Sequence, residues 1–441
     1  MPANMKKMAK STNFRWAVAW LIFTISFMSY MDRVNLSVAT PAIMQEFGLT
    51  KIDMGMVQSV FFLGYALCQV PGGMMAERFG QRITGAIAVV WWSFFTILTA
   101  VASGKFSFAF VRAMFGLGEA PLYPAAAITG HRWFNAHEKG AVSSFILCGC
   151  FLGPVFGPMI TVALMGAFGW KSVFLLFGAI GFLLGIVWYT FVKDNPKDSA
   201  HVNESELAHI NKDRVEATGE KKVAPWKRLL KSGQFWALGL QFLATDYIMY
   251  VFLSWLPVYL MEAHGFSMKE MGFWAATPWI ALILVVICCG RFSDRALAKG
   301  YSENVVKTVE GAAGILICSA MLFVTAQTTS AFTGVACLSV ALGALGLSMS
   351  AAWSSVISMG REYAGSVSGW MNLWGNIGGV LAPTITAWAA TNMGWSAALV
   401  VTAGFGVFGA VMWLFVKPAQ PVVDETPAAA AVPSTEPQTA A

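Results

Sequence analysis

Charged residues are scarce in this chain, and this scarcity excludes an ordinary soluble domain. Only 12% of the 441 residues are Asp, Glu, Lys or Arg, whereas 57% are hydrophobic. The charged fraction is about half of that in a typical soluble protein. Apolar stretches of the roughly 20 residues that cross a bilayer recur along the chain, each closed by a polar turn. The composition therefore predicts an integral membrane protein whose surroundings are a lipid bilayer.

Groups that commonly carry out chemistry are also few. None of the five histidines lies in the middle of an apolar stretch, so any proton coupling must be carried by acids. All seven cysteines lie in apolar stretches, and we interpret them as small packing residues and not as disulfides or metal ligands. No nucleophile–base set, metal-ligand cluster or phosphate-binding loop is present. The sequence thus predicts neither an enzyme nor a metal or other cofactor.

The hydrophobic pattern predicts an all-α integral membrane fold with twelve transmembrane helices. They lie near residues 16–38, 53–76, 83–103, 107–130, 140–168, 172–192, 235–261, 271–290, 305–326, 332–357, 364–391 and 395–416. Pro41 is predicted to end the helical extension of the first span. Because another span follows the first one at once and no small-residue cleavage site separates them, we expect the first span to be retained.

The distribution of basic residues predicts the orientation of these spans. A formal charge of +6 does not indicate nucleic-acid binding here, because the basic residues sort by loop instead of forming one basic face. With the N-terminus inside, only Lys51, Lys105, Lys171 and Lys269 fall in outer loops. The positive-inside rule then places both termini in the cytoplasm, which requires an even number of spans.

Two corresponding turns indicate that the chain consists of repeated halves. The turn after the second span contains Gly73, Glu77, Arg78, Gly80 and Arg82, and the turn after the eighth contains Gly290, Asp294 and Arg295. Two six-span halves with a site between them are typical of secondary transporters. We interpret these acid–arginine turns as gating loops that do not touch the substrate.

This repeat predicts four segments. They are an N-terminal six-helix bundle (1–192), a polar cytoplasmic linker (193–233), a C-terminal six-helix bundle (234–417) and a tail (418–441) whose composition indicates disorder.

Four charged residues within the spans are the strongest functional signal. Asp32 and Arg33 are adjacent near the end of the first span, and Arg112 and Glu119 are seven residues apart in the fourth. Each such charge costs roughly 2.5 to 3.5 kcal/mol in the middle of a membrane, so the four groups are expected to pair. Pro121 predicts a break in the helix just after Glu119. The second half is predicted to offer hydrogen bonds instead of charge, with only Asp246 as a comparable mid-span acid.

The residues Tyr30–Leu36, the turn at 72–80, Arg112 together with Gly-Glu-Ala-Pro at 118–121, and Phe-Leu-Ser-Trp-Leu-Pro at 252–257 resemble the anion:cation symporter family of the major facilitator superfamily. The resemblance extends through all twelve spans and is strongest to bacterial transporters of sugar acids such as galactonate and glucarate. It implies proton-coupled import of a small organic anion by alternating access, by a monomer in the bacterial inner membrane.

The resemblance also implies roles for individual residues. Asp32 and Glu119 correspond to the protonatable acids, and Arg33 and Arg112 to the groups that handle the substrate carboxylate. Residues at pocket-lining positions are Tyr30, Tyr65, Trp353 and Asn372, with Gln241, Asp246, Cys150, Ser350 and Asn376 as further candidates. Cys150 stands where related carriers often have glutamine, which predicts the loss of a hydrogen-bond partner for a substrate hydroxyl. Asp246 adds an acid where a neutral residue is expected.

Alternative interpretations remain open at this point. The four charges could form a purely structural ion-pair cluster, and Trp353 and Asn372 could serve ordinary packing. The run Gly149–Pro158 also resembles a motif of drug and metabolite exchangers, so an organic-anion exchanger is an alternative, as is a symporter for a dicarboxylic or aromatic acid. A channel or receptor is disfavoured, because it would not need two repeated halves.

Overall fold

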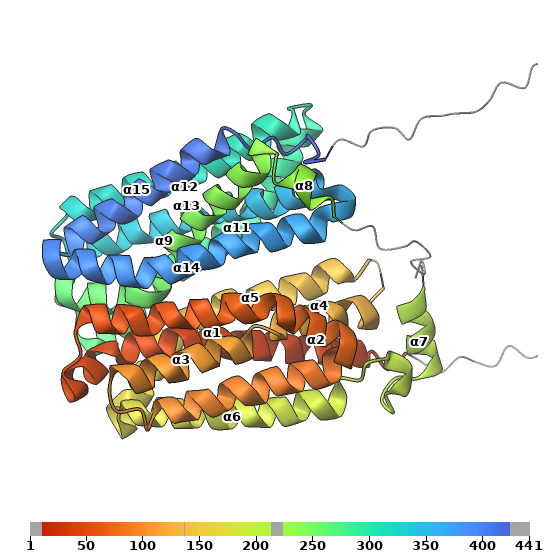
Figure 1. Cartoon of the computed structure of the whole chain (residues 1–441), viewed down its shortest axis with the longest axis horizontal. Helices are drawn as coiled ribbons and strands as arrows, with labels where there is room; N and C mark the ends of the chain where they lie inside the picture. Colours follow the sequence, from red (N-terminus) through yellow and green to blue (C-terminus); the bar gives the residue numbers. More distant parts are fainter. Residues whose placement is uncertain (1–10, 136, 213–223, 424–441) are drawn as a thin grey trace, which may run out of the picture.

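The computed structural model describes residues 11–135, 137–212 and 224–423, and every regular element within these ranges is a helix. Nine helical stretches in the described ranges are long and apolar enough to cross a membrane. The helices form two bundles, which follow each other along the chain and lie side by side (Figure 1). The prediction of an all-helical membrane fold is therefore confirmed.

The first bundle is built from α1 (Phe14–Phe47), α2 (Lys51–Thr99), α3 (Lys105–Glu119), α4 (Leu122–Trp133), α5 (Lys139–Phe168) and α6 (Trp170–Phe191). Within it, α1 packs on α5, while α2 packs on α3, α4 and α6. The α1–α5 contact is close because a Cβ at Gly153 would meet the Tyr30 side chain at 2.6 Å and the Phe27 carbonyl at 3.0 Å. The small residues of the fifth span thus allow close helix packing.

The second bundle is built from α9 (Gly233–His264), α10 (Met268–Trp274), α11 (Ala276–Ala298), α12 (Glu303–Gln327), α13 (Ala331–Gly360), α14 (Ala364–Met393) and α15 (Trp395–Trp413), with η2 (Arg361–Tyr363) between α13 and α14. In this bundle α13 packs on α11 and α12, while α9 packs on α14 and α15. Helix α9 is the most enclosed of the candidate spans: 94% of the residues in its 18-residue apolar stretch are buried. It lies at the boundary with the first bundle, which explains why it has almost no lipid-exposed surface.

Helix α2 changes direction at Gly80. A straight helix of its 49 residues would be about 74 Å long at 1.5 Å per residue, more than twice the apolar thickness of a bilayer. Gly80 has φ 83° and ψ 161°, a conformation that favours glycine. A Cβ at this position would overlap the Asp194 carboxylate, which accepts a hydrogen bond from the Arg82 backbone N–H at 3.1 Å. Both the backbone angle and the packing therefore require glycine.

Two proline predictions have different outcomes. The break after Glu119 is confirmed, because α3 ends at Glu119 and α4 begins after Pro121. The expected end of the first helix at Pro41 is wrong, since α1 continues through Pro41 to Phe47 and ends at Gly48 in the left-handed conformation. A proline within a helix removes one backbone donor, and the long, largely buried α1 remains helical despite this loss.

The two bundles contact each other through α2 with α14, α1 with α9, and α5 with α10 and α11. Polar contacts follow one another along the α2 side of this boundary: Lys51 Nζ to Glu262 Oε2 at 2.6 Å, Ser59 Oγ to Thr384 Oγ1 at 2.8 Å, and Asn376 Nδ2 to Gln69 Oε1 at 3.0 Å. They begin beside the α1–α2 turn, at the end of the molecule opposite to α7 and α8 (Figure 1). The bundles are thus joined at that end.

The predicted linker contains η1 (Pro196–Asp198), α7 (Glu204–Asn211) and α8 (Trp226–Leu229), while its residues 213–223 lie outside the described part. Asn203 caps α7 by accepting a hydrogen bond from the Glu206 N–H. Order extends further into the predicted tail than expected. Val422 is buried and donates its N–H to the Met359 carbonyl, so packing against α13 holds residues up to 423; residues 424–441 are outside the described ranges.

Candidate functional site

The centre of the candidate site is an ion pair between Arg33 of α1 and Glu119 at the end of α3. The Arg33 Nη2–Glu119 Oε1 distance is 3.0 Å, and Arg33 Nε donates to both carboxylate oxygens at 3.0 and 3.3 Å. The side chains are 5% and 0% exposed, respectively. Removing either partner would leave an uncompensated buried charge, which typically costs about 3 to 5 kcal/mol. In this conformation each side chain therefore needs the other to compensate its buried charge.

Aromatic rings enclose the guanidinium of Arg33. Its Cζ lies 4.7 Å from the ring centre of Tyr30, 5.0 Å from that of Phe61 and 5.1 Å from that of Tyr65. Each ring face attracts a cation. The structure therefore brings two predicted pocket residues, Tyr30 and Tyr65, to the predicted anion-binding arginine, and it adds Phe61, which the sequence analysis did not single out.

The second pair of charges is arranged differently from the first. Arg112 Nη1 donates to the backbone carbonyl of Asp32 at 3.3 Å, while the Asp32 carboxylate accepts from Asn35 Nδ2 at 3.2 Å. Within the described residues, no salt bridge joins the carboxylate of Asp32 to Arg112, and Asp32 Oδ2 and Arg112 Nε have no hydrogen-bond partner. The expected four-charge cluster is thus one tight ion pair beside two looser groups. Neighbouring residues on a helix point about 100° apart, so Asp32 cannot share the partner of Arg33.

A chain of hydrogen bonds leads away from Glu119. Ser29 Oγ of α1 is hydrogen-bonded to Glu119 Oε1 and lies 3.3 Å from the Tyr123 hydroxyl, which in turn lies 3.4 Å from Cys150 Sγ. Ser29 and Tyr123 were missed in the sequence analysis. Their spacing could have identified them, because Tyr123 lies one helical turn after Glu119 and Ser29 lies one turn before Arg33. Cys150 retains a hydroxyl partner, but this partner is a tyrosine of the protein.

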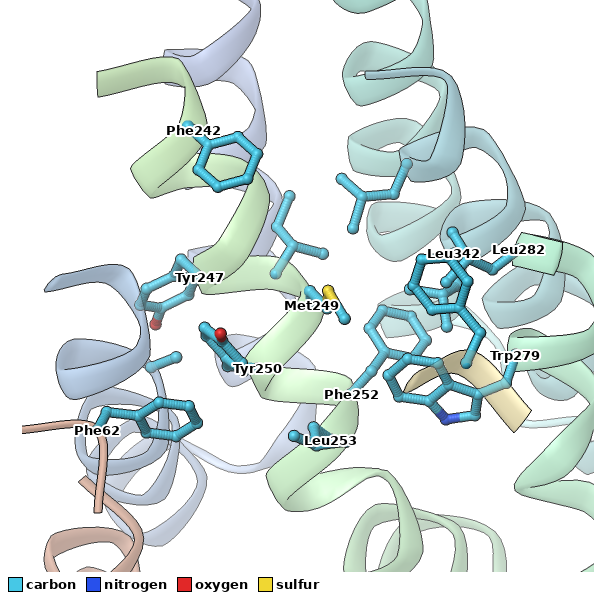
Figure 2. Close-up of a cluster of buried hydrophobic side chains, with 14 of the residues drawn as sticks. Phe62, Phe242, Tyr247, Met249, Tyr250, Phe252, Leu253, Trp279, Leu282 and Leu342 are labelled. Atoms are coloured by element: carbon cyan, nitrogen blue, oxygen red, sulfur yellow. The ribbon is translucent and has the colours of Figure 1, made fainter. Parts of the chain in front are cut away.

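The second bundle faces this site through α9. The Phe62 and Tyr250 rings lie 4.2 Å apart across the boundary, and Figure 2 shows Tyr250 on the side of α9 that faces Phe62, with Met249 and Phe252 on the side that faces Trp279 and Leu342. Asp246, one turn before Tyr250, lies within Coulombic reach of Arg33.

Asp246 is also closely packed against α14. The carboxylate is so near that a Cβ at Gly375 would overlap its Oδ2 atom. Asp246 is therefore a buried acid held at the bundle boundary on the side of Arg33. The role of Asp246 in transport stays a prediction.

Other predicted pocket residues of the second bundle are engaged with protein groups. Asn372 Nδ2 donates to the Ser368 carbonyl at 3.1 Å, and Asn376 Nδ2 bridges the Asn372 carbonyl and Gln69 Oε1. Trp353 is 41% exposed, and its ring packs edge-on against Phe242 at 6.1 Å. Asn376 thus joins the two bundles, whereas Trp353 keeps a surface that a ligand could contact.

Two lower-ranked candidates lie elsewhere in the second bundle. Gln241 is fully buried, and its Nε2 donates to the Leu238 carbonyl at 3.1 Å within α9. Ser350 lies against Cys289 of α11. The structure does not bring either side chain to the Arg33–Glu119 pair.

The second bundle also contains a buried ion pair, which corrects the expectation that Asp246 is its only comparable charge. Lys307 Nζ lies 3.3 Å from Glu310 Oε2 in α12, and the side chains are 10% and 9% exposed. Glu310 further accepts from Ser293 Oγ at 2.5 Å and from Cys289 Sγ at 3.1 Å. Sequence reasoning missed this pair because two opposite charges three residues apart near a helix start resemble an ordinary exposed helix terminus.

The two predicted gating turns differ in their contacts. In the first, Gly80 meets Asp194, Arg82 Nε donates to the Tyr189 carbonyl at 2.8 Å, and Arg132 Nη1 donates to Gln81 Oε1 at 2.9 Å. Asp194, which follows the end of α6, thus supplies an acid to this turn. Gly73, Glu77 and Arg78 lie on the preceding turn, with Glu77 and Arg78 exposed.

In the second turn, Asp294 and Arg295 are exposed near the end of α11. Over the described ranges, the structure shows no ion pair that joins either side chain to another residue. A pairing like that of Asp194 is therefore not repeated in the second bundle. Nor are three His, Cys, Asp or Glu side chains of the described ranges grouped so that they could hold a metal ion.

Buried charges at the boundary of two helical bundles are typical of secondary transporters. The family model of the Major Facilitator Superfamily matches residues 22–383, and the chain belongs to this superfamily. It is accordingly a membrane transporter and not an enzyme.

Several curated relatives cover most of the chain. A probable galactarate/D-glucarate transporter of Bacillus subtilis is 31% identical, covering 96% of each chain. A D-galactonate transporter of Escherichia coli is 30% identical, covering 92% of this chain and 96% of the relative. A chloroplastic ascorbate transporter of Arabidopsis thaliana is 29% identical, covering 93% of this chain and 76% of the relative. Their names describe transporters of different organic acids.

Among solved structures, a bacterial homologue of the human lysosomal transporter Spinster in an inward-facing, unoccupied conformation superimposes with a TM-score of 0.76. The two chains are 18% identical, and the alignment covers 91% of this chain and 96% of the other. At this identity the likeness shows the fold.

Proposed function

We propose that the protein is a secondary active transporter that imports an organic anion, a sugar acid of the hexonate, hexarate or hexuronate type, together with protons by alternating access. The observation that carries this proposal is the buried Arg33–Glu119 pair, which is enclosed by aromatic rings next to the bundle boundary. Two relatives that match nearly the whole chain are named as carriers of galactarate, glucarate or galactonate. These names support the choice of substrate class.

The proposed topology has twelve spans and cytoplasmic termini. Gly80 divides α2 into two spans, α3 and α4 together form the fourth, α10 and α11 the eighth, and η2 separates α13 from α14. This division supports an even number of crossings, so both ends of the chain lie on the same side. The basic loops favour the cytoplasm as that side. We propose a monomer in the bacterial inner membrane, with its bundles joined at the outer end.

The proposed coupling step is an exchange of partners at Arg33. A substrate carboxylate that binds the guanidinium competes with Glu119 for the same donors, because arginine binds carboxylates through a planar fork. A Glu119 carboxylate that loses its positive partner in a buried place binds a proton more readily. The loaded site then carries less net charge when the bundles rock. Arg112 and Asp32, whose side chains keep unpaired polar atoms, are the candidates for a second polar contact to the substrate or for a second proton.

This proposal can be tested with purified protein in liposomes. A thermal-shift screen against sugar acids, dicarboxylates and aromatic acids identifies the ligand, since a ligand that binds only the folded state raises its stability. Uptake of that ligand should accelerate with an inward proton gradient. Glu119→Gln should abolish proton-driven accumulation but retain exchange of ligand across the membrane. Intact gradient-driven uptake in this variant would contradict the proposed coupling.

Glu46→Gln is the matched control for the Glu119 variant. Glu46 is an acid of the same helix as Arg33, but it lies at the helix end and pairs with Lys171 at 2.7 Å, on the surface of the first bundle. Its replacement should leave proton-driven uptake unchanged. A loss of uptake in both variants would show that the assay reports general damage.

An exchanger of organic anions is the second candidate. Gly149 and Gly153 of the exchanger-like run pack directly on α1, the helix that carries Arg33, and a relative named as an ascorbate transporter shows that related chains carry other acids. Stimulation of uptake by internal anion, without any effect of the proton gradient, would support exchange instead of symport. Binding of a dicarboxylic or aromatic acid in the thermal-shift screen would change the substrate class.

A further inference from the structure

Glu119 has no direct contact with solvent, so a proton can reach it only through a neighbouring group. Its side chain is 0% exposed. In the part of the chain that the structure describes, its carboxylate accepts hydrogen bonds from two side chains, Arg33 and Ser29. Arg33 does not deprotonate in proteins. Ser29 is therefore the one neighbour that can pass a proton to Glu119.

Ser29 is also fully buried, but its second partner is not. The hydroxyl of Tyr123 lies 3.3 Å from Ser29 Oγ, and Tyr123 is partly exposed at the start of α4. Three consecutive polar groups thus connect a buried carboxylate to a residue with a solvent-accessible surface. They come from α3, α1 and α4, so the connection depends on how these helices pack.

We propose that Ser29 and Tyr123 form a proton relay to Glu119. This inference rests on the proposed function, because it assumes that Glu119 is loaded with a proton during transport. Neither residue is expected to contact the substrate carboxylate at Arg33. They are positioning and proton-transfer residues for the acid.

The hydrogen-bond directions follow from the chemistry of the groups. An ionised carboxylate only accepts, so the Ser29 hydroxyl donates to Glu119. The oxygen of Ser29 can then accept from the Tyr123 hydroxyl, whose oxygen accepts from the Cys150 thiol at 3.4 Å. All donors point toward the carboxylate. A thiol is a weak partner, so Cys150 supports the orientation of Tyr123 without holding its proton.

Proton transfer along the relay leaves no net charge on Ser29 or Tyr123. The Ser29 O–H bond breaks as an O–H bond forms on Glu119, and the Tyr123 O–H bond breaks as the hydroxyl of Ser29 is restored. Tyr123, a partly exposed residue, then regains its proton from a hydronium ion of the solvent. One proton has moved from water to the carboxylate, and both hydroxyl groups are unchanged. The reverse sequence releases the proton.

The test compares Tyr123→Phe and Ser29→Ala with the wild-type protein in liposomes, with radiolabelled D-galactonate or D-glucarate as the probe. Both variants keep the shape of the side chain but remove the hydroxyl. Each should slow uptake driven by a proton gradient about ten-fold or more, since a positioned proton-transfer group typically contributes factors of this size or larger. Exchange of labelled for unlabelled probe without a gradient should change less than about two-fold, because exchange needs no proton transfer to Glu119.

Two further measurements separate a relay from a structural role. Ser29→Thr keeps a hydroxyl and should restore gradient-driven uptake. Uptake in D2O should be slowed more in Tyr123→Phe than in the wild type, because proton delivery becomes rate-limiting when the relay is interrupted. Ser143→Ala is the control, since the Ser143 hydroxyl is exposed and donates to a carbonyl of its own helix. This control should behave like the wild type.

The outcomes distinguish the relay from the proposed function. If Glu119→Gln abolishes gradient-driven uptake while Tyr123→Phe and Ser29→Ala keep it, the relay is refuted and proton coupling at Glu119 stands. If both hydroxyl variants lose uptake and exchange equally, the two residues have a structural role and the relay is also refuted. If the wild type shows no response to the proton gradient, the proposed symport itself fails, and the relay fails with it.

Discussion

Replacing Glu206 by glutamine should release the linker helix α7 from the first bundle. The buried Glu206 carboxylate accepts four hydrogen bonds from the start of α1: from the Thr12 hydroxyl, from the Phe14 and Arg15 backbone N–H groups, each at 2.9 Å, and from Arg15 Nη1 at 3.2 Å. The first two N–H groups of a helix have no partner within the helix. Glu206 therefore caps α1 from a segment almost 200 residues later.

The free-energy cost of Glu206→Gln follows from the number of hydrogen-bond donors that lose their acceptor. A glutamine has one amide oxygen, which accepts about two hydrogen bonds, and its NH2 group faces donors. At least two of the four donors lose their partner, and bonds to a charged group are worth about 1.5 to 3 kcal/mol each. Arg15 keeps its two-pronged contact with Glu138, with both N–O distances at 3.0 Å. We expect the free energy of docking of α7 to weaken by about 3 kcal/mol, which lowers the ratio of docked to undocked α7 roughly 100-fold.

The stabilisation of the docked linker by Glu206 should be lost only at acidic pH. Burial alone raises the pKa of Glu206, but the hydrogen bonds from Arg15, Thr12 and Phe14 outweigh it and hold the pKa below the ordinary value of 4.5. A carboxyl group with a lowered pKa stabilises the docked state above its ordinary pKa, and this contribution is lost as the pH falls through the lower value. The contribution of Glu206 to the docking of α7 should therefore be constant from neutral pH down to about pH 5 and weaken only below that.

The assay is limited trypsin cleavage of the full-length protein, followed by mass spectrometry of the cut after Lys212, the residue after α7. Glu206→Gln should accelerate this cut strongly at neutral pH. Glu204→Gln is the matched control, because Glu204 lies in the first turn of the same helix but is exposed. Equal cleavage rates in the two variants would refute the inference that Glu206 docks the linker.

Two other predictions concern α2, one at its kink and one at its first residue. Gly80→Ala should destabilise the protein by about 2 kcal/mol or more, because its φ of 83° and the adjacent Asp194 both oppose a side chain. Thermal unfolding measures this loss. The control Gly73→Ala should show no such loss, since a Cβ at Gly73 meets no atom within 4 Å. Lys51→Glu places two acids at this end of the boundary between the bundles, so spin-label distances should shift toward opening there. The double exchange with Glu262→Lys should reverse the shift. The Lys51 and Glu262 side chains are 24% and 36% exposed, so the ion pair should contribute less than about 1 kcal/mol to closure of this end. Persistent opening in the double variant would contradict the role of the ion pair.

Much of the architecture follows from local features of the chain. Apolar stretches between polar turns predict the membrane helices, and Pro121 predicts the break that ends α3 at Glu119. The glycines of α5 predict a close helix contact, which the structure shows against α1. The prediction at Pro41 is wrong because proline chemistry is local, whereas the continuation of α1 depends on the packing of the entire helix.

The candidate site was predicted less completely. Membrane burial makes Arg33 and Glu119 conspicuous, and their resemblance to a transporter family adds Tyr30 and Tyr65. Lys307 and Glu310 escaped notice because a helix terminus commonly carries exposed charges. The packing of α12 within the second bundle buries them, with Ser293 and Cys289 of α11 against Glu310. Gln241 and Ser350 were included because they are polar within apolar spans, but the structure turns them toward their own bundle.

By itself, the sequence determined the membrane class, the all-helical fold and the mid-span charges of the first bundle, because each of these depends on the cost of placing a given residue in hydrocarbon. The tertiary structure alone decided the pairing. Asp32 and Arg33 are adjacent in the chain, yet Arg33 binds the carboxylate of Glu119 while the backbone carbonyl of Asp32 accepts from Arg112. Helix geometry points neighbouring side chains in different directions, and the packing of α1 within the first bundle determines which groups they meet. The connection from Glu119 through Ser29 to Tyr123 exists only in that packing.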